Sequence, residues 1–139
     1  MHISIQDFRC PSWNMIWSAN TWQQRHALAT RVHQWVRVGL NDHMDDLRLF
    51  NVPVAIMVIA QFSKQPIDAD NVLIKPVIDG LKSFVIEDDD LAFVASSTGI
   101  SCIGPVDSIE IFIKPAGTNH QWSDHDCSGR WLELINLST

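Results

Sequence analysis

The sequence predicts an α+β fold in which two main helices pack on one face of a small mixed β-sheet. Residues 52–62 form a continuous apolar run that is rich in β-branched side chains, which is typical of a buried central strand. Residues 21–39 and 73–84 instead repeat apolar side chains at helical spacing. A chain of 139 residues suits one compact domain. We expect this domain to cover residues 1–115, followed by a polar tail at 116–139.

Three shorter segments are expected to complete the sheet. Residues 2–6 alternate polar and apolar side chains, as a half-buried strand does, and residues 91–95 and 108–113 are similarly rich in strand-forming types. Pro53 has no backbone N–H to donate, so it fits only the beginning of the strand within 52–62.

The first predicted helix has clear signals at both ends. Thr21 and Gln24 have the capping-box spacing, and Gly39 followed by Asn41 indicates where the helix ends. Its apolar face is expected to contain Leu28, Val32 and Trp35, with Ala29 and Val36 beside them.

The second predicted helix is apolar at Leu73, Val77 and Leu81. Pro76 would remove a hydrogen bond from a helix interior. We therefore expect either an irregular first turn or a helix that properly begins near Lys75.

Charge and cysteine content narrow the classes of protein that fit. The net charge of −6 argues against a nucleic-acid binder, but seven of the sixteen acidic residues fall between 68 and 90 and call for their own explanation. The three cysteines are scattered, which favours a reducing cytoplasm over a disulfide framework. The longest apolar run is too short to span a bilayer, and no signal peptide is expected, so a membrane partner is not predicted.

The acidic stretch has the composition of a divalent-metal site. It contains Asp68 and Asp70, then Lys75, then Asp79, and finally the run Asp88–Asp90. Two carboxylates two residues apart in extended chain point to the same side, and a third from a later segment would complete a cage of oxygen ligands. Such ligands suit Mg²⁺ or Mn²⁺, which activate water and clamp the oxygens of a phosphodiester during hydrolysis. A nearby lysine can stabilise charge on the phosphate.

The same stretch resembles the RusA family of phage and prophage crossover-junction endodeoxyribonucleases. The family pattern is Asp-x-Asp-Asn, a short gap, Lys, three residues, Asp-x-Leu and then a pair of aspartates. Here it is matched by residues 68–71, 75, 79–81 and 87–90. The beginning of the chain, Pro11-Ser12-x-Asn14 before an arginine-containing helix, is also similar. The resemblance covers about residues 5–114.

This resemblance implies a Mg²⁺-dependent endodeoxyribonuclease, with Mn²⁺ able to replace Mg²⁺, that resolves Holliday junctions as a homodimer. Asp68 and Asp70 would bind the metal, and the third acid would be Asp90 or its neighbour Asp89. Lys75 would act at the phosphate, and Asp79 would support the site. Four residues separate Asp70 from Lys75 where the family has three, so Lys75 needs an irregular turn to point inward.

DNA contacts of such an enzyme require a basic face. The candidates for nucleic-acid binding are Arg25, Arg31, Lys64, Lys75 and Lys82, with Arg37 and Lys114 as further basic residues. A solvated helix face explains the arginines equally well. Two other functions stay open: a non-catalytic protein that binds DNA junctions, and a metal-binding structural protein without a DNA role. We expect the four tryptophans of the N-terminal third to pack in a core or dimer interface, with stacking on nucleic-acid bases as the alternative. We expect the His-, Asp- and Cys-containing segment 120–127 to be a polar tail.

Overall fold

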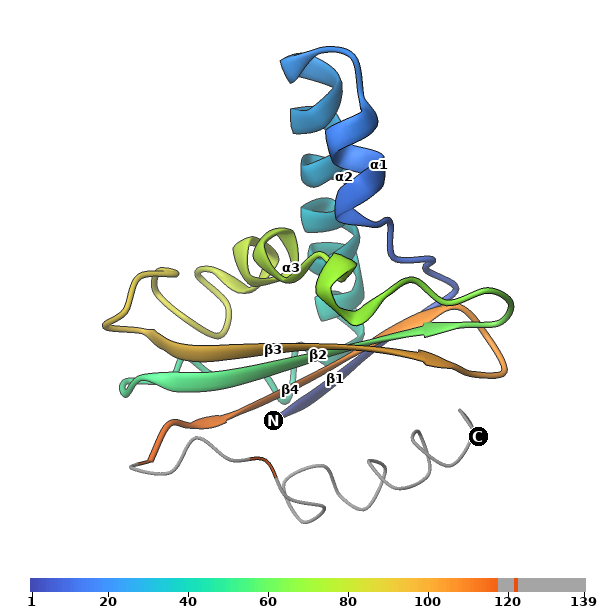
Figure 1. The fold of residues 1–139 in the computed structure, drawn as a ribbon. Helices are drawn as coiled ribbons and strands as arrows, with labels where there is room; N and C mark the ends of the chain where they lie inside the picture. Colours follow the sequence, from blue (N-terminus) through green and yellow to red (C-terminus); the bar gives the residue numbers. More distant parts are fainter. Residues whose placement is uncertain (118–121, 123–139) are drawn as a thin grey trace.

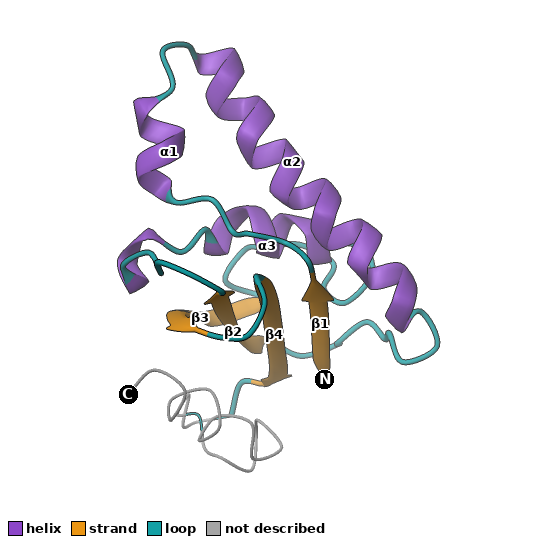
Figure 2. Ribbon diagram, turned by 90° about the vertical axis from the view of Figure 1, so that its right-hand side faces the viewer, coloured by secondary structure: helices purple, strands orange, loops and turns teal. Residues whose placement is uncertain are grey.

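The protein folds as a four-stranded mixed sheet with helices packed on one face (Figures 1 and 2). This computed structural model describes residues 1–117 and residue 122. The strands are β1 (His2–Gln6), β2 (Val54–Phe62), β3 (Val94–Ile103) and β4 (Ser108–Pro115). The α-helices are α1 (Trp13–Ser18), α2 (Trp22–Leu40) and α3 (Ile74–Leu81), and two short 3-10 helices are η1 (Asn41–His43) and η2 (Ala69–Asn71). The predicted α+β class with a mixed sheet is confirmed.

The central position of β2 follows from its composition. The strand order is β1-β4-β2-β3, so β2 has a neighbour on each side, parallel β3 and antiparallel β4. All nine residues of β2 are buried, as expected for an apolar strand covered on both faces. The connection from β2 to parallel β3 contains η2 and α3, because parallel neighbours need a crossover. This crossover carries the acidic stretch.

Alternate residues of β2 serve two apolar layers. Val54, Ile56 and Val58 belong to the main core between the sheet and the helices. Met57 and Ile59 point to the other face, where they pack with Phe112 and the partly buried Trp122. The edge strand β3 is exposed or half-buried along most of its length.

Helix α2 begins and ends where its sequence signals predict. The Thr21 hydroxyl accepts a hydrogen bond from the Gln24 backbone N–H at 3.2 Å, and the Gln24 side chain accepts one from the Thr21 backbone N–H at 3.2 Å. The buried face is shifted along the helix from the predicted one: Val32, Val36 and Leu40 are buried, whereas Trp35 is 41% exposed. Only the C-terminal half of α2 lies over the sheet, and its N-terminal half projects away with α1 (Figures 1 and 2).

The strand predicted at residues 91–95 is mostly wrong, because β3 begins at Val94 and continues to Ile103. Residues 91–93 form a turn. The Asp90 backbone carbonyl accepts hydrogen bonds from the N–H groups of Phe93 (3.0 Å) and Val94 (2.8 Å). Its carboxylate accepts one from the Ala92 N–H at 2.8 Å. These local bonds give the backbone a turn in place of a strand ladder. The strand predicted at 108–113 is confirmed within β4.

Along the described residues, we find no helix whose length and apolar content would let it cross a membrane. The expected tail, including the segment 120–127 with its histidines, aspartates and cysteine, lies outside the described residues apart from 116, 117 and 122.

Candidate functional site

Helix α3 presents the lysine and the first acid of the site. The helix begins at Ile74, so Pro76 falls in the first turn, where a backbone N–H has no partner within the helix and its loss costs little. Val77 and Leu81 are fully buried in the core. Lys75 and Asp79 occupy the more exposed side, one helical turn apart, and the Lys75 Nζ lies 2.6 Å from an Asp79 oxygen.

A tight turn after α3 returns the chain toward the helix. Ser83 has a φ of 69°, in the left-handed region that few non-glycine residues adopt. Its N–H donates to the Ile86 carbonyl at 2.7 Å, and Phe84 donates to the Leu81 carbonyl at 3.2 Å. Val85 and Ile86 are buried behind the turn, which anchors it. The acidic run 87–90 follows directly and so comes to lie beside α3.

The turn brings two lysines and three aspartates together, and we call Lys75, Lys82, Asp79, Asp88 and Asp89 the lysine–aspartate cluster. Asp89 is its centre, because one carboxylate oxygen contacts Lys75 and the other contacts Lys82. Lys82 also lies 2.8 Å from Asp88 and 3.9 Å from Asp79. The like charges of the acidic run are thus partly neutralised by cations from α3 and its C-terminal end.

These contacts shift the pKa values of the cluster. The hydrogen bond from Lys75, followed by that from Lys82, holds the pKa of Asp89 well below its usual 3.8. Hydrogen bonds to Asp88 and Asp89 raise the pKa of Lys82. Burial lowers the pKa of Lys75, but its hydrogen bonds to Asp79 and Asp89 outweigh burial and raise it overall. At neutral pH Lys75 and Lys82 are therefore protonated and Asp89 is ionised.

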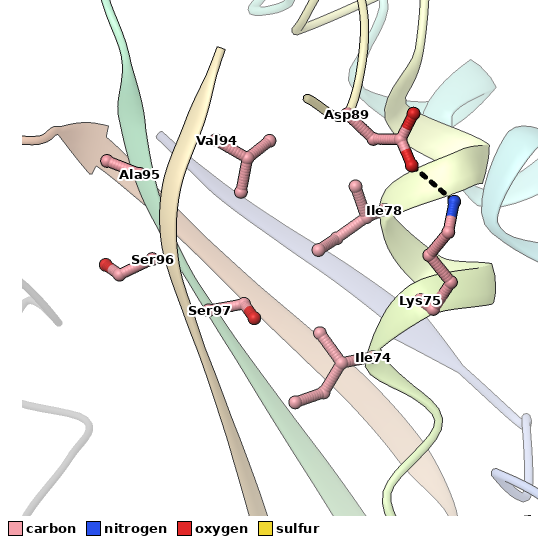
Figure 3. Close-up of a pocket in the computed structure, with 8 residues that line it drawn as sticks. All are labelled: Ile74, Lys75, Ile78, Asp89, Val94, Ala95, Ser96 and Ser97. Atoms are coloured by element: carbon pink, nitrogen blue, oxygen red, sulfur yellow. Dashed lines mark hydrogen bonds and ion pairs between the residues drawn. The ribbon is translucent and has the colours of Figure 1, made fainter. Parts of the chain in front are cut away.

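Lys75 and Asp89 also line an open pocket of about 380 Å³ between α3 and the edge strand β3 (Figure 3). Ile74 and Ile78 form its helical side, and the first four residues of β3, including Ser96 and Ser97, form the other side. The ion pair between Lys75 and Asp89 lies at one end of this pocket (Figure 3). The pocket thus combines apolar walls, hydroxyl groups and a cation.

Asp68 and Asp70 are exposed and lie in a different local structure from the predicted one. We expected an extended Asp-x-Asp segment, but residues 69–71 form η2, a single 3-10 turn. The Asn71 N–H donates to the Asp68 carbonyl at 2.9 Å and the Val72 N–H to the Ala69 carbonyl at 3.3 Å. A turn of this kind separates the directions of the two side chains, because the alternation of an extended strand is lost.

The carboxylates of the described residues do not form the expected metal cage. Their oxygens are the right donors for Mg²⁺. However, within residues 1–117 and 122 no three acidic, histidine or cysteine side chains gather closely enough to hold a metal ion. Both oxygens of Asp89 are occupied by lysines. In this arrangement the described carboxylates are not gathered into a Mg²⁺ site.

The structure distinguishes the two aspartates that the sequence leaves open as the third acid. Asp89 faces Lys75 in the pocket, whereas the Asp90 carboxylate accepts a hydrogen bond from the Ala92 N–H within the turn that precedes β3. Of the two, only Asp89 is therefore placed beside the predicted lysine.

The predicted DNA-binding residues divide into separate groups. Lys75 and Lys82 belong to the lysine–aspartate cluster. Arg25 and Arg31 lie on α2, and Lys64 is exposed in the loop after β2. The contacts of Lys82 with Asp88 and Asp89 were not predicted from the sequence. Ser96 and Ser97 were likewise not predicted as pocket residues. One sequence signal for an ion pair of Lys82 was available: Lys82 follows Asp79 by three residues, which places the two side chains about one helical turn apart.

Comparisons with other proteins add no assignment: no model of a known protein family matches the chain, and a search of curated proteins found no similar sequence.

Removal of Lys82 tests the cluster directly. We expect Lys82→Met to raise the pKa of Asp89 toward 3.8, because one of its two cationic partners is lost while Lys75 remains. An NMR titration of the aspartate carboxyl carbons in the absence of divalent metal measures this pKa. The variant Lys64→Met, which removes an exposed lysine outside the cluster, should leave it unchanged. An unaltered Asp89 pKa in Lys82→Met would show that the Lys82–Asp89 contact is not formed in solution.

The same pKa shift has a consequence for stability. Because the pKa of Asp89 is lower in the folded chain than in the unfolded chain, its ion pairs stabilise the fold at pH values above about 3.8. This contribution is lost as the pH falls through the lower, folded-state pKa.

Proposed function

We propose that the chain is an endodeoxyribonuclease of the RusA type that cuts Holliday junctions or other branched DNA by hydrolysing phosphodiester bonds. The observation that supports it best is the pairing of Lys75 with Asp89 in one pocket, although the two residues are 14 positions apart in the chain. The resemblance of residues 68–90 to that family implies a role for Lys75 and for Asp90 or its neighbour Asp89 as the third acid. A protonated lysine in an open pocket is suited to stabilise negative charge on a phosphate.

The proposal includes Mg²⁺ as cofactor, bound through Asp68, Asp70 and either Asp89 or Asp90, and a homodimer whose two sites act on opposed strands. Carboxylate oxygens are the ligands such an ion prefers. The described carboxylates are not gathered as such a site requires, so the need for a metal must be measured directly.

The decisive experiment incubates the purified protein with an end-labelled four-way DNA junction. We expect symmetric nicks in Mg²⁺ and none in EDTA, and we expect Asp70→Asn to lower the nicking rate in Mg²⁺ by about 100-fold or more. Asp45→Asn removes another exposed aspartate, located after α2, and should retain the wild-type rate. Failure of the wild-type protein to nick the junction in Mg²⁺ would contradict the proposal.

A second candidate function is a protein that binds DNA junctions without cutting them. The observation that favours it is the occupation of both Asp89 oxygens by lysines, and among the described residues no three carboxylates lie close enough to hold a metal ion. It predicts junction binding without nicks in Mg²⁺, and binding that Asp70→Asn leaves unchanged.

A further inference from the structure

Helices α1 and α2 form a hairpin that projects from the sheet and carries an unusual charge. Both views show α1 beside the N-terminal half of α2, away from the strands (Figures 1 and 2). Residues 13–40, which contain this hairpin, include three arginines and two histidines but no aspartate or glutamate. All sixteen acidic residues of the chain lie elsewhere. The hairpin is therefore a positively charged projection on a protein whose net charge is −6.

The arginines of the hairpin are not used for ion pairs within the described part of the chain. The carboxylate partners found there belong to other cations, and none pairs with Arg25, Arg31 or Arg37. The Arg25 Nε donates to the Ala19 carbonyl at 3.2 Å, and its guanidinium lies 5.4 Å from the centre of the Trp17 ring. These contacts fix Arg25 beside the tip of the hairpin without neutralising its charge.

Two tryptophans are exposed on either side of the same tip. Trp17 is 62% exposed at the end of α1, and Trp22 is 70% exposed at the beginning of α2. The Trp22 ring stacks on the His26 ring, with centroids 5.2 Å apart and planes 7° apart. Neither tryptophan belongs to the core clusters. Large aromatic side chains left in water beside unpaired cations indicate a surface that binds a partner.

We propose that the tip of this hairpin binds DNA at an unpaired or unstacked base, with Trp22 stacking on the base and Arg25 and Arg31 contacting the flanking phosphates. Bases stack on exposed aromatic rings whatever their sequence, and arginine both neutralises phosphate and stacks on rings. This inference rests on the proposed function only in taking DNA as the partner, and it concerns binding in the absence of cleavage.

The charge of the hairpin favours DNA over a second copy of this chain. A two-fold symmetric contact would place the same patch on both subunits, so arginines would face arginines and oppose association. DNA is a polyanion that carries flat bases. It therefore complements both the positive charge and the exposed tryptophan rings of the hairpin.

The test measures binding of fluorescently labelled DNA by anisotropy in EDTA, where no metal-dependent cleavage occurs. The probes are a four-way junction, a single-stranded oligonucleotide and a duplex of equal length. We expect Trp22→Ala to weaken binding to the single strand and the junction by about tenfold and binding to the duplex by less than about twofold. Trp22→Phe should retain most of the affinity, because a phenyl ring still stacks. Since Trp22 is exposed, these variants should keep the wild-type thermal unfolding temperature.

A second set of variants tests the arginines. Arg25→Ala should lower the slope of log affinity against log salt concentration by about 1, as loss of one phosphate contact does. Arg48→Ala is the matched control, because Arg48 also lies over an aromatic ring, that of Phe50, but outside the hairpin. Its affinity and salt dependence should equal those of the wild type.

The outcomes separate this inference from the proposed function. Single-strand binding that is lost in Trp22→Ala supports the inference even if the wild-type protein never cuts a junction. Cleavage by the wild-type protein with unchanged binding by Trp22→Ala overturns the inference and leaves the proposed nuclease standing. A dimer that dissociates in Trp22→Ala, as seen by analytical ultracentrifugation, without a change in DNA affinity would assign the surface to a second copy and also overturn it.

Discussion

Replacing Asp89 by asparagine is expected to lower the rate of junction cleavage by about 100-fold or more, whereas Asp90→Asn should leave the rate within about threefold of wild type. Asp89 is the acid that contacts both Lys75 and Lys82 and lines the pocket. Asparagine removes its charge with little change in shape. The Asp90 side chain instead accepts a backbone hydrogen bond from Ala92, and an asparagine oxygen at that place can accept the same bond.

The pair of variants is best compared in single-turnover cleavage with protein in excess, so that substrate affinity does not limit the rate. Junction binding in EDTA provides an independent measurement: Asp89→Asn removes one negative charge, so its affinity at low salt should equal or exceed that of the wild type. Loss of activity in Asp90→Asn with retention in Asp89→Asn would move the third acid to Asp90 and contradict the placement given by the pocket.

The parts of the fold that sequence reasoning predicted well are those fixed by local signals. The strand within 52–62 combines length, β-branched composition and full apolarity, and it forms the central strand with every residue buried. Helix α2 begins at a capping box and ends at Leu40, close to the predicted boundary. Its buried face was less predictable, because which face is covered depends on where the helix crosses the sheet. For this reason Trp35 is half exposed rather than buried.

The candidate site was predictable as a set of residues but not as an arrangement. The sequence named Lys75, Asp79 and, as the alternative to Asp90, Asp89, and these three residues meet in the cluster. The turn at Ser83, with its positive φ, decides which aspartate of the run faces α3, and no sequence pattern specifies that rotation. The single 3-10 turn at 69–71 likewise replaces the extended segment on which the expected metal cage depended.

The tryptophans show a further limit of sequence reasoning. An aromatic side chain is most often buried, so core or interface packing was the natural expectation for the N-terminal third. Trp17 and Trp22 are exposed because α1 and the beginning of α2 extend beyond the sheet. That projection is a property of the tertiary arrangement, which composition and periodicity do not contain.

Gly80→Ala is expected to destabilise the protein by about 2 kcal/mol, because the contact between α2 and α3 leaves no room for a Cβ atom. A Cβ at position 80 would lie 2.6 Å from both Cβ and Cγ1 of Val36 and 3.2 Å from the His33 carbonyl oxygen. The Val36 Cβ is fixed to the helix backbone and cannot rotate away, so the two helices must move apart. In a helix with free space around the glycine, the same substitution would stabilise the protein by about 1 kcal/mol. A loss of stability in Gly80→Ala would therefore show that α2 and α3 approach each other closely at this position.

The measurement is urea denaturation of Gly80→Ala beside Gly117→Ala, where an added Cβ meets no atom within 4 Å and stability should stay within about 0.5 kcal/mol of wild type. Displacement of α3 would also shift Lys75 and Asp79, since both side chains project from that helix. We therefore expect Gly80→Ala to reduce junction cleavage at temperatures where it remains folded, even though Gly80 is itself neither a lining residue of the pocket nor a member of the cluster. A Gly80→Ala protein as stable as the wild type would mean that α3 packs less closely on α2, and the position of the lysine–aspartate cluster would then need to be reassigned.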